Sequence, residues 1–214
     1  MTDHRHDSYD DRLRLLLLLD ACEVADISPV PIMRFHALAF LANVLGPVWS
    51  LDSYEGKILK RRGGPFYPEL QEQLDHLVGL GLVTIHNIGH SFIEGRWRLE
   101  GEFALNAEAT KPLIDVAASF SSERRVMAFL RRLAIAASQI SEPIEVLVGF
   151  DATWSDQRTG TGDVIDFSEW RRANYSAYAI QAFEQSIAKG VSSTRGDRLQ
   201  VYMRYLERRL HGTA

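Results

Sequence analysis

The residues best suited to chemistry lie in a Gly-, Thr- and Asp-rich segment over 151–166. Its carboxylates are Asp151, Asp156, Asp163 and Asp166. Such a group could hold a divalent cation, because hard cations prefer oxygen ligands, and would then suit a metal-dependent hydrolase. The same residue types also form turns, since short Asp side chains accept hydrogen bonds from nearby backbone N–H groups. We favour the turn, and the Gly160-x-Gly162 pair lacks the third glycine of a nucleotide-binding loop.

Other catalytic motifs are absent from the sequence. It contains no P-loop, no GxSxG, no HExxH and no Cys/His zinc set. His36 lies in an apolar helical segment, as expected for a hydrogen-bonded core histidine, and no histidine forms a credible triad with Ser or Cys. The single cysteine, Cys22, also lies in an apolar run, as expected for a buried thiol in a reducing compartment. We therefore predict that the chain is not an enzyme and uses no cofactor or metal.

Basic residues form local groups, although the chain as a whole has a formal net charge of -4. The groups that could contact phosphate are Lys57, Lys60, Arg61 and Arg62; Arg96 and Arg98; and Arg124, Arg125, Arg131 and Arg132. Each group alone also fits the solvated face of an amphipathic element. Together they leave a non-specific DNA contact open, driven by charge rather than by base recognition.

The clearest predicted helix, Pro68–Leu80, is acidic. Its exposed positions include Glu69, Glu72 and Asp75, and it carries no lysine or arginine. Gln71 and Gln73 could read adenine, but the neighbouring carboxylates repel phosphate. This helix therefore suits a protein partner better than the major groove of DNA.

Apolar periodicity and turn residues predict an α+β chain that is mostly helical. Helices are expected over 8–26, 31–45, 68–80, 112–120, 121–139, 169–189 and 197–211, and strands over 82–85, 96–105 and 144–150. Helices followed by a hairpin over 82–105 predict a winged-helix domain at 1–106. A mainly helical region at 107–214 follows, and the two can share one core. The alternative for the first part is another α+β domain with a helix–hairpin unit.

The run Leu15–Leu19 is the most apolar segment of the first predicted helix. Charged residues bracket it, and it is far shorter than the roughly 20 residues that span a bilayer. Five consecutive leucines cover every side of a helix, so we expect burial on several faces. No secretory signal is visible, and we predict a cytoplasmic protein without a membrane contact.

Two stretches carry a family resemblance. The segments RFHALAFLANVLGPVW…GKILKRRGGPFYPELQEQLDHLVGLGLV and VGFDATWSDQRTGTGDVIDFSEW…NYSAYAIQAF resemble the middle component of prokaryotic three-component ABC-ATPase systems, which include Lamassu-like antiviral defence. The resemblance implies a non-catalytic adaptor that links an SMC-like ABC ATPase to an effector nuclease. The shorter stretch FHALAFLAN…GGPFYPELQEQLDHLVGLGLV also resembles SocA-like antitoxins. A winged-helix transcription regulator is a further alternative.

A protein-binding adaptor needs apolar anchors, which are often aromatic. The candidates for a partner interface are Trp49, Tyr54, Phe66, Tyr67, Phe92 and Trp97. Each could instead belong to the core.

Overall fold

The computed structural model describes residues 4–51, 57–61, 64–93, 95–156, 160–166, 174–186 and 194–212. It has a mixed α+β fold with two small antiparallel sheets. The helices are α1 (His4–Val24), α2 (Ile32–Leu45), α3 (Pro68–Gly79), α4 (Ala107–Ser119), α5 (Ser121–Ser138), α6 (Ile144–Leu147), α8 (Tyr175–Ser186) and α9 (Arg195–Leu210). Two 3-10 helices are η1 (Gly46–Trp49) and η2 (Val148–Phe150). The strands are β1 (Val30–Pro31), β2 (Lys57–Arg61), β3 (Gly64–Phe66), β4 (Val83–Ile93), β5 (Arg96–Leu105) and β6 (Val164–Asp166).

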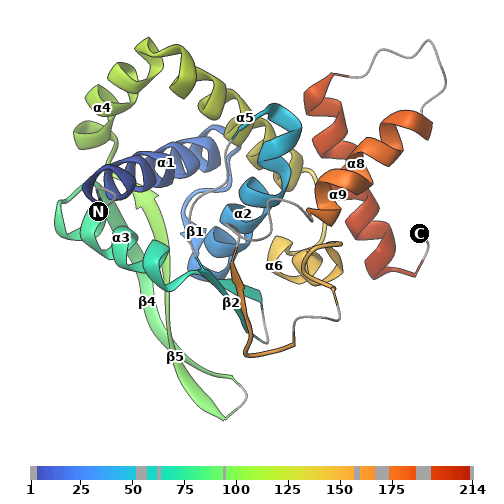
Figure 1. The fold of residues 1–214 in the computed structure, drawn as a ribbon. Helices are drawn as coiled ribbons and strands as arrows, with labels where there is room; N and C mark the ends of the chain where they lie inside the picture. Colours follow the sequence, from blue (N-terminus) through green and yellow to red (C-terminus); the bar gives the residue numbers. More distant parts are fainter. Residues whose placement is uncertain are drawn as a thin grey trace.

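The first sheet has the order β1-β5-β4. Its long strands, β4 and β5, form a hairpin that projects away from the helical body (Figure 1). The hairpin base is apolar, with Val83 opposite Leu105 and Ile85 opposite Phe103. Ile85 is partly buried and the other three are buried. The far half of the hairpin therefore extends beyond the part of the sheet that the helices cover.

The second sheet joins distant parts of the chain. Its order is β3-β2-β6, and Ile58 of β2 lies opposite Ile165 of β6. Both isoleucines are fully buried. The predicted boundary near Asn106 thus does not separate two cores, since residues on both sides of it belong to one contiguous buried cluster.

Helix α1 lies between α4 and α3 (Figure 1) and packs against α3, α5 and β5. The run Leu15–Leu19 is buried throughout, which confirms the expectation of burial on several faces. At the edge of this contact, Nε and Nη2 of Arg131 both donate to Oδ2 of Asp20, at 3.1 and 2.9 Å. One helix with little exposed apolar surface thereby connects both halves of the chain.

Helix α2 is the other core helix. Together with η1 it forms the window Ile32–Trp49, which is apolar and long enough to cross a membrane by composition alone. Two thirds of that window, 67%, is buried inside the protein. Burial of this kind is typical of a core helix, which is apolar on all sides because protein surrounds it.

Several predicted boundaries are corrected. The apolar run 144–150 was expected to be a strand, but Ile144, Leu147 and Val148 are buried at helical spacing in α6 and η2, while Val146 is exposed. Helix α4 begins at Ala107 rather than near Pro112, which lies inside it. Thr110 lies within the helix, and its hydroxyl donates to the carbonyl of Asn106 at 2.8 Å. The predicted helix 169–189 is described only over α8.

Cys22 is a fully buried free thiol, as expected. Burial raises its pKa to about 12, so almost no thiolate exists at pH 8, and the thiolate is the reactive form. We expect no labelling by a thiol reagent such as DTNB in the native protein and one equivalent after unfolding in guanidinium. Rapid labelling of the native protein at pH 8 would contradict this burial.

Candidate interaction surfaces

The β4–β5 hairpin carries an apolar face beyond the core. A bulge between His86 and Gly89 adds one residue to β4, with Asn87 in the left-handed region at φ 51. The extra residue shifts the alternation of β4, so that Phe92 shares a face with Val83 instead of pointing the other way. The face that is buried at the hairpin base therefore continues to its tip.

At that tip, Phe92 and Trp97 are directly opposite each other. Their ring centroids are 5.3 Å apart, and the side chains are 60% and 72% exposed. Ile88, next to the bulge, is 64% exposed. Large apolar side chains grouped on a projecting element are typical of a protein-binding surface rather than of scattered surface residues.

The other predicted aromatic anchors pack within the chain. Tyr67 is buried, with its hydroxyl accepting a hydrogen bond from Asn43 at 3.1 Å, so its assignment to a partner surface is corrected. Trp49 is half-buried with its ring 5.7 Å from that of Phe129. Phe66 is also half-buried, 4.7 Å from the His36 ring. Tyr54 lies outside the described residues.

His36 holds α2 against α3. It is fully buried, and its Nδ1 accepts the backbone N–H of Tyr67 at 3.3 Å. Its Nε2 donates to Oε1 of Gln71 at 3.1 Å. This is the hydrogen-bonded core histidine that the sequence predicted, and it uses one of the two glutamines on α3.

Three further polar side chains of α3 are also engaged. Nε of Arg12, on α1, donates to Gln73 at 2.6 Å, and its Nη2 lies 3.2 Å from Nδ1 of His76. The amide nitrogen of Gln71 donates to Asp75 at 2.8 Å. Reading adenine would require both glutamines to leave these partners, and Glu69 and Glu72 remain exposed beside them.

The predicted basic groups are divided between surface and structural roles. Lys57 is exposed, whereas Nζ of Lys60 donates to the carbonyl of Asp156 at 3.3 Å and lies 5.5 Å from the Trp154 ring centroid. Burial lowers the pKa of Lys60, although the carboxylates of Asp156 and Asp163 oppose the shift. Arg62 and the side chain of Arg61 lie outside the described residues.

The described arginines of α5 are divided between exposed and structural positions. Arg124 donates to the carbonyls of Ala118 and Ser119 at 2.9 and 2.8 Å, and Arg131 pairs with Asp20. Arg125 and Arg132 are exposed. On β5, the backbone places Arg96 opposite Ile93 and Arg98 opposite Ser91, and their side chains lie outside the described part.

The Asp-rich segment forms turns, as the sequence favoured. Oδ2 of Asp163 accepts the N–H of Gly160 at 2.6 Å, and Gly162, at φ 99, donates its N–H to the carbonyl of Lys60 at 2.7 Å. Asp166 belongs to β6, opposite Lys57. Within the described residues, no three His, Cys, Asp or Glu side chains gather into a group that could hold a metal ion.

Asp151 has a different role from the other acidic residues of the segment. Its carboxylate is fully buried, and Oδ1 accepts the N–H groups of Thr153 and Trp154 at 2.8 and 3.0 Å. Oδ2 accepts the hydroxyls of Tyr202 at 2.6 Å and Ser176 at 2.8 Å. These donors come from the loop itself, from α9 and from α8, so one carboxylate joins the C-terminal helices to the body.

Burial is the main influence on the ionisation of this cluster. It raises the pKa of Asp151, and the hydrogen bonds from Tyr202, Trp154, Ser176 and Thr153 only partly oppose the shift. Burial and the neighbouring carboxyl also raise the pKa of Tyr202 far above its ordinary value. The cluster is enclosed and its donors are paired, which is the arrangement of a structural polar network.

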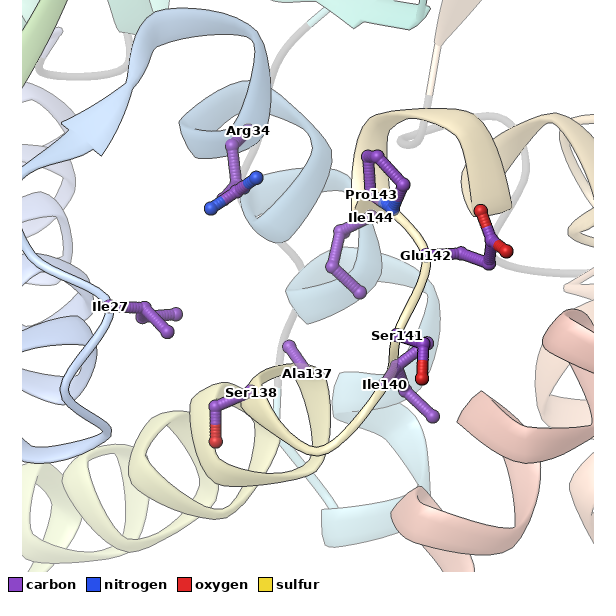
Figure 2. Close-up of a pocket in the computed structure, with 9 residues that line it drawn as sticks. All are labelled: Ile27, Arg34, Ala137, Ser138, Ile140, Ser141, Glu142, Pro143 and Ile144. Carbon is purple, nitrogen blue, oxygen red and sulfur yellow. The ribbon is translucent and has the colours of Figure 1, made fainter.

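A pocket of about 160 Å³ lies between α2 and the turn after α5. Figure 2 shows Arg34 on one side of it, and Ser138, Pro143 and Ile144 on the others. Nε of Arg34 lies 3.5 Å from a carboxylate oxygen of Glu145, and the Ser138 hydroxyl donates to a backbone carbonyl. Both of these side chains, Arg34 and Ser138, thus have partners within the chain.

No protein-family model matches this chain, and no curated protein matches it either.

Two features escaped the sequence analysis. The part of the Asp151 network that joins the helices has no local sequence signal, because Ser176 and Tyr202 are 25 and 51 residues away from Asp151. An exposed apolar stripe on α4 did have one, since Leu113, Val116 and Phe120 are spaced as neighbours on one helix face.

Proposed function

We propose that the first part of the chain is a winged-helix domain. The element order α1-β1-α2-α3-β4-β5 supports this, as does the sheet order β1-β5-β4, in which the short strand after α1 flanks the hairpin. In this interpretation β2 and β3 are an insertion between α2 and α3, and the hairpin is the wing.

We further propose that the chain is a non-catalytic adaptor subunit, which links an SMC-like ABC ATPase to an effector nuclease in cytoplasmic antiviral defence. The observation that carries the adaptor role is the exposed pair of Phe92 and Trp97 at the hairpin tip. Aromatic side chains of this kind are frequent hot spots of protein interfaces. The identity of the partners follows from the resemblance of residues 34–183 to the middle components of such systems.

The polar face of α3 favours this role over sequence-specific DNA binding. Its two glutamines are bonded to His36 and Arg12, and its exposed carboxylates repel phosphate. A winged helix whose third helix is held in this way is better suited to present its wing to a protein.

The test is co-expression of the chain with its genomic neighbours, followed by affinity purification and measurement of the copurifying subunits. We expect a large coiled-coil ATPase and a further subunit in fixed stoichiometry. Trp97→Ala should weaken the complex at least about 30-fold, because hot-spot residues contribute about 2 kcal/mol or more. Tyr178→Ala is the matched control, since it removes a half-exposed aromatic ring from α8.

Three outcomes would contradict the adaptor role. In the first, the chain purifies alone and no co-encoded protein binds it. In the second, it binds duplex DNA with an affinity that falls steeply with salt, as expected for a transcription regulator. In the third, it neutralises a toxic neighbour by direct binding, as expected for an antitoxin.

A further inference from the structure

Helix α4 carries an apolar stripe that the body does not cover. Leu113, Val116 and Phe120 are 44%, 61% and 58% exposed. The side of the helix that adjoins the stripe faces the body, where Thr110 and Ala117 are buried. Figure 1 shows α4 at the edge of the molecule, outside α1. An exposed stripe at this spacing is a helix face that can pack against another helix.

The stripe is graded in size along the helix. Ala109, which is also exposed, lies at its N-terminal end, Leu113 and Val116 lie in the middle, and Phe120 lies at its C-terminal end. If a second α4 packs antiparallel about a two-fold axis between Leu113 and Val116, each Phe120 lies over the small Ala109 of the other copy. Leu113 then meets Val116, so large and small side chains alternate across the contact as a two-fold interface requires.

The charges at the two ends of the helix are also self-complementary. Glu108 is exposed in the first turn of α4, and the guanidinium of Arg124 is held at its last turn by the carbonyls of Ala118 and Ser119. Antiparallel packing brings each Glu108 towards Arg124 of the other copy. Along the flank, Lys111 and Asp115 neutralise each other within one helix at 3.3 Å, which leaves no like-charge repulsion there.

We propose that α4 is the contact surface of a two-fold homodimer, in which the stripe of one chain packs antiparallel on that of a second. This interface is separate from the hairpin tip and does not depend on the adaptor role. A single pair of short helices covers less than the roughly 1,600 Å² of a standard interface. The dimer is therefore weak, and it dissociates on dilution.

Sedimentation equilibrium over a wide range of concentrations tests the proposal. We expect a monomer–dimer equilibrium for the wild-type chain and dissociation at least about 30-fold easier for Val116→Glu, which buries a charge at the centre. Val201→Glu, at a 45% exposed position on α9, is the matched control and should leave the equilibrium unchanged. Circular dichroism checks that each variant is folded.

A size exchange distinguishes the antiparallel arrangement from other contacts. Ala109→Phe places two large rings together and Phe120→Ala leaves a gap, so each single variant should weaken the dimer. The double variant A109F/F120A moves the large residue to the other end of both stripes and should restore dimerisation to within about 3-fold of wild type. A monomeric wild type, an undisturbed Val116→Glu dimer, or a double variant without restoration would overturn the proposal. Trp97→Ala should leave the dimer unaffected, which separates this result from the test of the adaptor role.

Discussion

Replacement of Asp151 by alanine is expected to lower the free energy of unfolding by about 3–5 kcal/mol, because a buried network would lose its common acceptor. Two backbone N–H groups and the hydroxyls of Ser176 and Tyr202 donate to this carboxylate. Without it these donors lose their shared acceptor, although Ser176 keeps its contact with the Thr153 hydroxyl at 2.7 Å, and water must enter or α8 and α9 must shift. Urea denaturation followed by circular dichroism measures the change, and Asp10→Ala, at an exposed position on α1, is the control. A loss below about 1 kcal/mol would contradict the network's importance.

The ionisation of Asp151 also gives a pH dependence with a defined sign. Burial raises its folded-state pKa above the ordinary value of about 3.9. Between the ordinary and the raised pKa, the unfolded chain releases a proton that the folded chain keeps, so the carboxyl's contribution to stability falls as pH rises through that window. Below the ordinary pKa both states are protonated, and above the raised pKa both are ionised, so the contribution is constant on either side.

The variant Asp151→Asn removes this titration while keeping the shape of the side chain. The difference in unfolding free energy between wild type and Asp151→Asn should therefore change in favour of the variant as pH rises from about 4. Urea denaturation of both proteins at several pH values from 4 to 8 measures the difference. If the wild type instead gains stability relative to the variant over this range, the hydrogen bonds to the carboxylate outweigh its burial.

Leu17→Ala is expected to cost about 2–5 kcal/mol in unfolding free energy, since truncation of a core leucine loses apolar contacts and leaves a cavity. Leu17 is fully buried in the run Leu15–Leu19 of α1. On the same helix, Val24 is 53% exposed, and Val24→Ala should change stability by less than about 0.5 kcal/mol. Chemical denaturation of the two variants provides the comparison. Equal effects would show that α1 is not the central helix of the core.

The sequence predicted those elements whose signals are local. Pro68 at the first helical position and the spacing of Leu70, Leu74 and Leu77 placed α3 within one residue of its observed bounds. The leucine run predicted the burial of α1. Two strand-like runs on either side of a Gly- and polar-rich tip predicted the hairpin. Phe92 and Trp97 were candidates only as aromatic residues, and the sequence did not separate them from Tyr67.

The wrong predictions concern residues whose structure depends on contacts with residues far away in the sequence. The run 144–150 was too short for its periodicity to separate strand from helix, and packing of Ile144 and Leu147 on the core selected the helix. Tyr67 and Phe92 were both aromatic candidates for the partner interface. Tyr67 is buried because α2 supplies Asn43 and His36 beside it. The donors of Asp151 likewise become neighbours only when α8 and α9 fold onto the body.

The pairing of β2 with β6 has a consequence for biosynthesis. Residues 57–61 cannot complete their sheet until residues 164–166 have left the ribosome, more than a hundred residues later. Until then Ile58 lacks its partner Ile165, and β2 presents an open edge to other nascent chains. The chain must therefore close its structure late in translation, and nascent-chain release assays should detect stable folding only when the exposed segment includes β6.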